Sequence, residues 1–415
     1  MHIVFVTNEL ATEKNASGGL ASFTANMARI FAEKGHRVTI ILFTTKETTL
    51  DFSPSIRLEN VFIRKEIWNQ LDKAAGILGL GNGRLHEDIR KTLVNLKKSI
   101  NVSKKIREID KKEKVDIVHY CNLNAPSLLA SPKIPYVVRM SHFMRVYWKA
   151  CERNFSLEQK KYPATLRVKA EEFALKRARY VISPSILIAE LTEKIVGVRP
   201  DILESPFVLE KKKWNDAVYQ QVLKNKKYVF HYGRLGYFKG TYLVAETVCQ
   251  LLEEFPDIYV VMAGSNEKMY DEASGEALEA YELVKRRAKQ YGDRVIYLGQ
   301  LVREKLYPVI EHAQVCWLPY RLDNLSNAII EAMAIGTIVV GSECLGQLIE
   351  DGISGYLGER EEAQVYLRLL RQTLCLEEKE KMRMIENARE RIDRLRPEEV
   401  YRRYSQYYSK VIREW

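Results

Sequence analysis

Short apolar runs alternate with helical patterns along the whole chain, and this alternation limits the fold more than any other feature of the sequence. The first series occupies residues 1–205, and a second series of the same kind starts at residue 228. Alternating strands and helices form parallel sheets with helices on both faces. The chain has 415 residues, which is too long for one ordinary hydrophobic core and suits two. The sequence therefore predicts an α/β protein with two doubly wound domains.

The expected elements follow from the hydrophobic periodicity. The first series gives strands at Ile3–Thr7, Val38–Phe43, Val61–Arg64, Asp116–Cys121, Tyr136–Met140 and Tyr180–Pro184, with helices near 19–35, 85–112, 157–178 and 186–196. The second series gives strands at Tyr228–Tyr232, Ile258–Ala263, Val295–Leu298, Val315–Leu318 and Ile338–Val340. A charged stretch separates the two series, so we expect a linker near 205–215. The predicted domains are 1–205 and 206–396, followed by a helix over 397–415.

The composition narrows the class of protein and of partner. No run of about 18 apolar residues occurs, so no transmembrane helix is expected. The N-terminal segment lacks a basic region and is expected to be a buried strand rather than a signal peptide. The six cysteines form no C-x-x-C pair, which is typical of reduced thiols in a cytosolic protein. The net charge of +11 favours an anionic partner such as a nucleotide, a lipid phosphate or a membrane surface.

Two carboxylates lie close together in the second series. Asp323 falls in a loop, and a helix is expected over Leu325–Ala334 with Asn324 or Ser326 as its N-cap. Glu331 is expected about two turns into that helix. Carboxylates beside the amides of a helix N-terminus can bind a ligand that carries both hydroxyls and phosphates. An equally ordinary interpretation is a capped helix whose glutamate pairs with a neighbouring Lys or Arg.

A basic motif follows the first strand of the second series. Gly233-Arg234-Leu235 is followed four residues later by Lys239 and then glycine. The planar guanidinium of Arg234 and the ammonium of Lys239 together suit the charges of a diphosphate. Gly264 ends the next strand and would allow a ligand to approach the backbone.

The first series offers weaker signals. Gly18-Gly19 precedes the first helix, where free backbone amides can bind an anion. The dinucleotide fingerprint G-x-G-x-x-G is absent there, and the cluster Gly79–Gly83 has the wrong spacing, so a nicotinamide site is not expected. His142 follows a strand end, where ligands of α/β sheets bind. His119 falls inside a strand and is expected to be structural.

These motifs, in this order, resemble glycosyltransferase family 4, which includes bacterial polysaccharide and glycolipid glycosyltransferases. The resemblance rests on Asp323-x7-Glu331 followed by Ala-Met-Ala-x-Gly, and on Gly-Arg-Leu followed by Lys-Gly. It implies the GT-B fold, with two Rossmann-like domains facing each other across a cleft and the last helix crossing back to the first. The first acid is usually Glu in the family. The loop Cys344-Leu345-Gly346-Gln347 stands where the family usually has Gly-Gly and then Glu.

The resemblance also implies a reaction and the residues that perform it. It implies retaining transfer from a nucleotide-diphosphate sugar, with Arg234, Lys239, Asp323 and His142 near the reacting atoms. Donor contacts are implied for Gly18, Gly19, Gly233, Arg234, Lys239, Gly264, Asp323, Asn324, Leu325, Ser326 and Glu331. Glu331 would bind the ribose, and Asp323 with the amides after it would bind the sugar. No D-x-D motif occurs, so neither a metal nor another cofactor is expected.

The acceptor is the least determined part of the prediction. Basic pairs at residues 90, 97, 104 and 111 repeat every seven residues, which on one helix predicts a basic ridge. Such a ridge suits an anionic membrane and a lipid or lipid-linked acceptor, although a solvated helix face has the same pattern. Two other functions stay open: a GT-B epimerase or hydrolase, and a non-catalytic subunit that binds sugar nucleotide or lipid. We expect a cytoplasmic protein, with no nucleic-acid partner.

Overall fold

The structure is a computed structural model that describes residues 1–11, 18–44, 52–77, 84–150, 165–209, 214–271, 273–359 and 361–415. The glycine cluster Gly79–Gly83, Ser17 and the start of the helix expected at 157 lie outside the described residues. The chain divides into two compact units. The first comprises Met1–Trp148, Ser156–Pro206 and Pro397–Trp415, and the second comprises Lys149–Phe155 and Phe207–Arg396.

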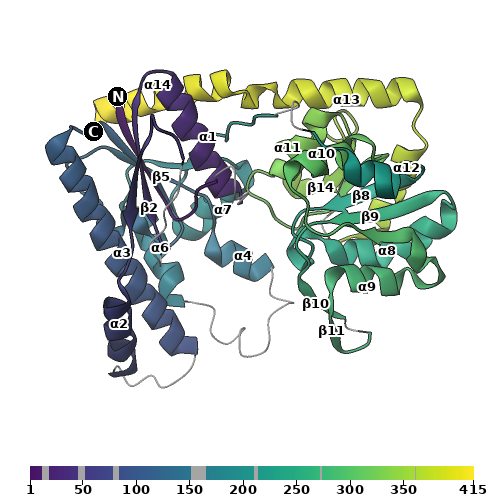
Figure 1. Ribbon diagram of the computed structural model, residues 1–415, viewed down its shortest axis with the longest axis horizontal. Helices are drawn as coiled ribbons and strands as arrows, with labels where there is room; N and C mark the ends of the chain where they lie inside the picture. Colours follow the sequence, from purple (N-terminus) through teal and green to yellow (C-terminus); the bar gives the residue numbers. More distant parts are fainter. Residues whose placement is uncertain are drawn as a thin grey trace. The chain divides into compact units, whose positions relative to one another are not determined.

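The first unit is built on a parallel sheet (Figure 1). Among the described residues its strand order is β3-β2-β1-β4-β5-β6-β7. The strands are β1 (His2–Thr7), β2 (Arg37–Phe43), β3 (Arg57–Val61), β4 (Ile117–Cys121), β5 (Tyr136–Arg139), β6 (Val181–Ser183) and β7 (Asp201–Ile202). The helices are α1 (Gly19–Glu33), α2 (Lys65–Ile77), α3 (Arg84–Lys112), α4 (Met144–Ala150), α6 (Thr165–Arg177), α7 (Ile186–Val196) and α14 (Pro397–Glu414), with a 3-10 turn η1 (Pro126–Leu129).

The central strands form where the sequence predicts them, but the edge of this sheet differs. All six residues of β1 are buried, as a strand with neighbours and helices on both sides requires. The strand expected at Val61–Arg64 instead ends at Val61, because β3 is an edge strand whose half-exposed residues give no apolar run. The segment after it forms α2, where we expected no helix. Ala75 is buried in that helix, and the helical spacing of its apolar residues was overlooked.

The last helix, α14, closes the first unit. Tyr408 Oη lies 2.6 Å from Nδ1 of His119, and Tyr404 Oη donates to the carbonyl of Leu203 at 3.0 Å. Both tyrosines are fully buried, and the chain's two ends contact the same apolar cluster (Figure 1). Burial holds the pKa of His119 well below its ordinary value, so this histidine is a neutral core residue. Its structural role, expected from the sequence, is confirmed.

The predicted basic ridge on α3 needs a correction. Lys98 is buried at 7% exposure, with its ammonium 5.9 Å from the ring of Phe43, and burial lowers its pKa. Lys105 forms an ion pair with Glu59 of β3 at 3.5 Å. Adjacent residues of a helix point about 100° apart, so in the two middle pairs the second lysine turns toward the sheet, whereas both lysines of the last pair, Lys111 and Lys112, are exposed. The outward series on the helix is Lys97, Lys104 and Lys111.

The second unit contains another parallel sheet and a small hairpin (Figure 1). The order in the described residues is β12-β9-β8-β13-β14-β15. Its strands are β8 (Lys227–Tyr232), β9 (Ile258–Ala263), β12 (Val295–Tyr297), β13 (Val315–Leu318), β14 (Val339–Ser342) and β15 (Tyr356–Gly358), and the antiparallel hairpin is β10 (Lys268–Asp271) with β11 (Glu276–Glu279). Its helices are α8 (Thr241–Glu254), α9 (Ala280–Arg287), α10 (Arg303–Glu311), α11 (Asn327–Ile335), α12 (Ala363–Leu374) and α13 (Glu378–Ile392).

Apolar side chains cover both faces of this second sheet. Val229 of β8 packs into one buried cluster, whereas its neighbours Tyr228 and Phe230 pack into the other. This alternation follows from the two-residue period of a strand. The hairpin and β15 were not foreseen, because their short, mostly polar segments carry no apolar run. No helix in the described part of the chain is long and apolar enough to span a membrane.

Candidate active site

Two glycines at neighbouring strand ends form the floor of the candidate site in the second unit. Gly233 follows β8 with φ 115°, and Gly264 follows β9 with φ 132°. A Cβ on Gly264 would lie 1.6 Å from the carbonyl oxygen of Gly233. Any side chain there would therefore force the two strand ends apart. The carboxyl edge of a parallel sheet is where ligands of this fold class bind, and here the two glycines let neighbouring strand ends and the Tyr320 hydroxyl lie in close contact.

Arg234 and Lys239 flank these glycines, and each already has a carboxylate partner. Arg234 donates from Nε to Glu267, and its side chain is 70% exposed. Lys239 ends a 3-10 turn, η5 (Tyr237–Lys239), and its Nζ lies 2.5 Å from Oδ2 of Asp323. The sequence predicts that these two cations lie at one strand end. The structure places both there and adds Glu267, which sequence reasoning missed because it lies 33 residues from its partner.

The ion pair of Lys239 and Asp323 is the more enclosed of the two. Both side chains are 16% exposed, and the ammonium lies 3.9 Å from the centre of the Tyr320 ring. The other oxygen of Asp323 accepts from the amide of Asn324 at 2.8 Å. This arrangement presents a cation and a hydrogen-bond acceptor side by side. It can bind an anionic group and a hydroxyl group of one ligand at once.

Helix α11 begins two residues later than the sequence predicts. Ser326 is the N-cap, and its hydroxyl accepts from the amide of Ile329 at 3.4 Å. One of the two predicted N-caps is thus confirmed. Asn324 and Leu325 belong to the loop, because the Ser326 side chain satisfies the first free amide of the helix. The helix ends at Gly336, which has φ 107° and caps the C-terminus.

Glu331 lies about one turn into α11, not two, and faces α10. Its Oε1 accepts from Nε of Arg303 at 3.1 Å and from the hydroxyl of Tyr307 at 3.3 Å. The residue is 5% exposed, and burial raises its pKa against the opposing effect of Arg303. The structure therefore separates the two acids that the sequence aimed into one cleft: Asp323 pairs with Lys239, and Glu331 pairs with Arg303.

Buried Tyr320 links these two networks. Burial, and then the charges of Asp323, Cys316 and Glu331, raise the pKa of its hydroxyl. That hydroxyl donates to the carbonyl of Tyr232 at 2.8 Å. The carbonyl of Tyr320 accepts from the hydroxyl of Ser342 and from Sγ of Cys344, the latter at 3.1 Å. The loop after β14 therefore begins in contact with the residue beneath Lys239.

The first unit contributes a helix N-terminus and a histidine at its own carboxyl edge. Gly18 is the N-cap of α1 without a side-chain hydrogen bond, and Gly19 is the first helical residue. A Cβ on Gly18 would lie 3.9 Å from a carboxylate oxygen of Glu9, whose pKa is raised by burial. The His142 ring stacks on Tyr147 with centres 4.2 Å apart.

Asn122 fixes the backbone at His142 and was missed by sequence reasoning. Its Oδ1 accepts from the amides of Ser141 and His142 at 2.7 and 3.2 Å, and its Nδ2 donates to the His142 carbonyl. The residue is 2% exposed. Its place directly after β4 was the available signal, because polar residues at strand ends meet along the carboxyl edge.

A buried carboxyl, Glu171 of α6, lies near the same loop. It is 4% exposed, and its Oε1 accepts from the amide of Asn124 at 2.9 Å. Asn124 and Ala125 both have positive φ, 65° and 51°, which is a strained conformation for residues with a side chain. Burial raises the pKa of Glu171 to about 8. No group of three or more His, Cys, Asp or Glu residues in the described ranges is arranged to hold a metal ion.

Comparison with known proteins gives matches along most of the chain. A family model described as Glycosyltransferase Family 4 matches residues 17–204, and one described as Glycosyl transferases group 1 matches residues 213–391. A curated relative, the uncharacterized glycosyltransferase YqgM of Bacillus subtilis (strain 168), is 24% identical over 184 residues, which is 44% of this chain and 47% of the relative. The chain thus matches less than half of that relative's length.

Solved structures share the whole fold at low sequence identity. Sucrose-phosphate synthase from Thermosynechococcus elongatus has a TM-score of 0.70 at 18% identity, with 100% of both chains covered. HepE of Anabaena in complex with UDP has a TM-score of 0.67 at 15% identity, covering 99% of this chain and 100% of the other. The predicted fold class, two Rossmann-like α/β domains, is confirmed by these likenesses.

Proposed function

Because the chain belongs to the GT-B glycosyltransferases, with a family 4 domain followed by a group 1 domain, we propose that it transfers a sugar with retention from a nucleotide-diphosphate sugar to a glycan, lipid or lipid-linked acceptor. One observation carries the proposal: Lys239 and Asp323 lie 2.5 Å apart, above the ring of Tyr320, at the carboxyl edge of the second sheet. A cation and a hydrogen-bond acceptor at that place suit a sugar diphosphate.

The proposed mechanism assigns separate parts of the donor to these groups. Negative charge grows on the diphosphate as its bond to the sugar breaks, and Arg234 and Lys239 stabilise that charge. Asp323 accepts from a hydroxyl of the sugar. Glu331 accepts from the ribose hydroxyls and keeps Arg303 as its counterion. On the acceptor side, we propose that His142, held by Asn122, lies near the transferred sugar and that Gly18 and Gly19 face the diphosphate.

Donor binding can be tested before the acceptor is known. HepE of Anabaena has been solved with UDP and with UDP-glucose, so uridine nucleotides are the first probes. A ligand at 100 times its dissociation constant stabilises the folded state by about 2.7 kcal/mol. We expect UDP or a UDP-sugar to raise the melting temperature more than its GDP and ADP counterparts. Absence of a shift with all three nucleotide classes would contradict the proposal.

We also propose that turnover needs no divalent metal, because the two cations already offset the diphosphate charge. Activity should persist in excess EDTA. Loss of activity that Mg²⁺ or Mn²⁺ restores would contradict this point, while leaving the donor class intact. Product analysis with donor alone separates a transferase, which needs an acceptor, from an epimerase or hydrolase.

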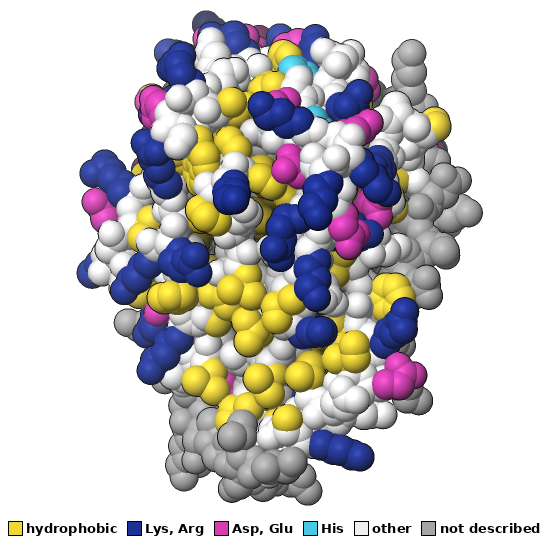
Figure 2. All heavy atoms as spheres, turned by 90° about the vertical axis from the view of Figure 1, so that its left-hand side faces the viewer, with side chains coloured by type: hydrophobic (Ala, Val, Ile, Leu, Met, Phe, Trp, Pro, Cys, Tyr) yellow, Lys and Arg dark blue, Asp and Glu magenta, His cyan; other side chains and the backbone are white. Residues whose placement is uncertain are grey.

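We propose further that the acceptor is reached at a membrane surface, on the cytoplasmic side. The outward lysines Lys97, Lys104 and Lys111 of α3 lie one helical heptad apart. Figure 2 shows the side of the first unit on which α3 lies, with apolar side chains gathered in its lower half and Lys and Arg side chains between them. Each basic residue near an anionic lipid surface adds about 1 kcal/mol of binding.

Exposed apolar residues on three adjoining elements support the membrane proposal. They are Leu96 of α3, Leu129 of η1, and Leu166 and Phe173 of α6, all more than a third exposed. Hydrogen bonds tie η1 to both helices: the amide of Leu129 donates to Ser99, and Arg177 donates to the carbonyl of Leu128. An apolar patch bordered by lysines suits the interface of an anionic bilayer.

Liposome sedimentation tests this surface. Wild type should pellet with anionic vesicles at low salt, and much less with neutral vesicles or at high salt. Changing Lys97, Lys104 and Lys111 to Gln should release it. The matched control changes Lys285, Lys289 and Lys305, exposed lysines of the second unit, and should still pellet. If wild type stays in solution, or if both triple variants behave alike, the patch does not bind membrane.

A further inference from the structure

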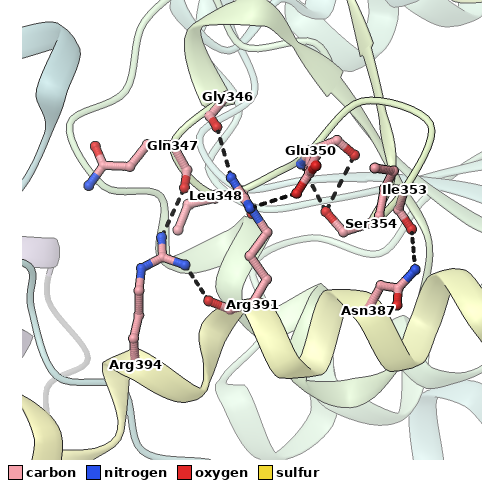
Figure 3. Close-up of polar contacts among 9 residues, drawn as sticks. All are labelled: Gly346, Gln347, Leu348, Glu350, Ile353, Ser354, Asn387, Arg391 and Arg394. Atoms are coloured by element: carbon pink, nitrogen blue, oxygen red, sulfur yellow. Dashed lines mark hydrogen bonds and ion pairs between the residues drawn. The ribbon is translucent and has the colours of Figure 1, made fainter.

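Helix α13 and the turn after it hold the loop that follows β14 (Figure 3). Arg391 donates from Nε to the carbonyl of Leu348 at 2.8 Å and from Nη2 to the carbonyl of Gly346 at 3.4 Å. Arg394 donates from Nη2 to the carbonyl of Gln347 at 2.9 Å. Three consecutive carbonyls of this loop are thus bound by two guanidinium groups from one side.

The two arginines are themselves held in place. Nη1 of Arg391 lies 3.0 Å from Oε2 of Glu350, and Arg394 donates to the carbonyl of Arg391 at the end of α13. The Arg391 side chain is 29% exposed, so its charge is partly desolvated. A guanidinium can donate several hydrogen bonds in fixed directions, whereas the ammonium of lysine is a compact charge at the end of a flexible side chain. Arg391 therefore fixes two peptide groups and one carboxylate at once.

The loop also contains a 3-10 turn, in which the amide of Gly346 donates to the carbonyl of Glu343 at 3.2 Å, and the amides of Leu348 and Ile349 both donate to the carbonyl of Leu345. Gly346 has φ −58°, an ordinary value that any residue adopts, so no left-handed glycine sets a turn here. Members of glycosyltransferase family 4 usually have Gly-Gly at this place, whereas this chain has Cys344-Leu345-Gly346. In a planar trans peptide the carbonyl and the next amide point in opposite directions. Because the amides of Leu348 and Ile349 are bonded within the loop, the arginines act on the carbonyl side of the same peptide groups.

The held loop adjoins the candidate donor site. Its first residues, Ser342 and Cys344, contact the carbonyl of Tyr320. The ring of that tyrosine lies 3.9 Å from the ammonium of Lys239. The loop is therefore joined by two hydrogen bonds to the tyrosine beneath Lys239.

We propose that Arg391 and Arg394 are positioning residues for the donor: they set the backbone of residues 343–348 so that it contacts the nucleotide-diphosphate sugar. This inference rests on the proposed function and extends it to two residues that touch no donor atom. It also assigns to α13 the part that a Gly-Gly sequence plays in related enzymes. In this chain the backbone conformation of the loop is set by hydrogen bonds from Arg391 and Arg394 and not by glycines of the loop itself.

The experiment compares conservative variants of Arg391, in the last turn of α13, and of Arg394, in the turn that follows it. Arg391→Lys and Arg394→Lys keep the charge but lose the multiple directed bonds. Because lysine replaces several directed hydrogen bonds to the loop carbonyls by one at most, we expect each variant to raise KM for the donor about tenfold. The value of kcat should stay within about twofold, since the loop binds ground state and transition state alike. UDP affinity measured by calorimetry should fall in parallel.

Asn387 supplies the matched control. It lies on the same helix and donates to the carbonyl of Ile353 at 3.1 Å, beyond the loop (Figure 3). Asn387→Ala should keep the wild-type KM. Hydrogen exchange supplies a second measurement that needs no turnover: the amides of Leu348 and Ile349, which both donate to the Leu345 carbonyl, should exchange faster in the two arginine variants.

The outcomes separate the inference from the proposed function. Wild type that binds no nucleotide and transfers no sugar would refute the proposed function itself. Wild type that binds UDP, with arginine variants whose KM is unchanged, would overturn only the positioning role. So would a rise in KM that Asn387→Ala shares, or a loss of kcat at constant KM. If a lysine variant fails to fold, unchanged exchange at residues 348 and 349 in the other variant overturns the inference.

Discussion

The carboxyl edges of the two parallel sheets carry opposite chemistry. In the second unit the edge holds cations, Arg234 and Lys239, each paired with a partly exposed carboxylate. In the first unit the edge holds Asn122, His142 and the buried carboxyl of Glu171. The same architecture thus offers partly exposed ion pairs at one edge, and at the other buried hydrogen-bonding groups that include the guanidinium of Arg139 at the end of β5.

This difference indicates which kind of ligand group each edge can bind. Ion pairs near the surface can exchange a carboxylate for a phosphate at little cost, since both partners stay charged and hydrated. A buried carboxyl whose pKa is raised to about 8 holds its proton at neutral pH, so it can donate as well as accept. The second edge therefore suits a diphosphate, and the first suits the hydroxyls of a sugar or an acceptor.

The largest expected effect tests the cations of the second edge. Lys239→Ala and Arg234→Ala should each lower turnover by roughly two orders of magnitude, because losing one donor to transition-state charge costs about 3–4 kcal/mol. The melting temperature should change little for Arg234, whose side chain is largely exposed. The control is Arg286→Ala, which breaks an exposed ion pair with Glu276 in the same unit. Near-normal turnover in both site variants would show that Arg234 and Lys239 do not stabilise the diphosphate. The inferred difference between the two sheet edges would then not hold.

The next effect separates the two acids of the second unit. Glu331→Gln should weaken binding of free UDP about tenfold, because a hydrogen bond to a charged group is worth about 1.5–3 kcal/mol. Asp323→Asn should leave UDP affinity alone and weaken a UDP-sugar. Calorimetry with both ligands measures this, with Glu276→Gln as the control. Equal losses for both ligands in both variants would show that the acids do not divide the donor between them.

The last effect, which is small at any one pH step, tests the protonated state of the first edge. The folded-state pKa of Glu171, about 8, lies above its ordinary value of 4.5. The folded state therefore binds the proton more tightly, and the stabilisation is complete below the lower value and lost as pH rises through the higher one. Unfolding free energy should fall between about pH 5 and 8, by at most about 1.4 kcal/mol per pH unit from this group.

Glu171→Gln isolates that contribution, because its amide oxygen can still accept from Asn124. The melting temperature of this variant, relative to wild type, should rise as pH rises. Glu172→Gln is the control: it is the neighbouring acid, held by Arg145 at 2.6 Å. Parallel pH profiles for wild type and Glu171→Gln would mean that Glu171 is ionised in the folded state, and the two edges would then differ less than we infer.

Much of the fold could be predicted from the sequence because local patterns suffice for it. Buried central strands such as β1 and β9 are continuous apolar runs, and the N-cap Ser326 is a local hydrogen bond. The glycines and basic residues of the donor motif follow strand ends directly, so their place at the sheet edge follows from topology. Edge strand β3, helix α2 and the hairpin were missed or misplaced, because half-exposed segments lack that periodicity.

What the sequence by itself determined is therefore the fold class and which residue types gather at each strand end. Only the tertiary structure decided their partners: Lys239 with Asp323, Glu331 with Arg303, Lys98 turned inward, and Arg391 on the loop after β14. The two residues of an ion pair lie 28 positions apart in the sequence for Arg303 and Glu331, and 84 positions apart for Lys239 and Asp323. Hydrogen bonds and ion pairs act over about 3–4 Å of space, and no local pattern records which distant segments come that close.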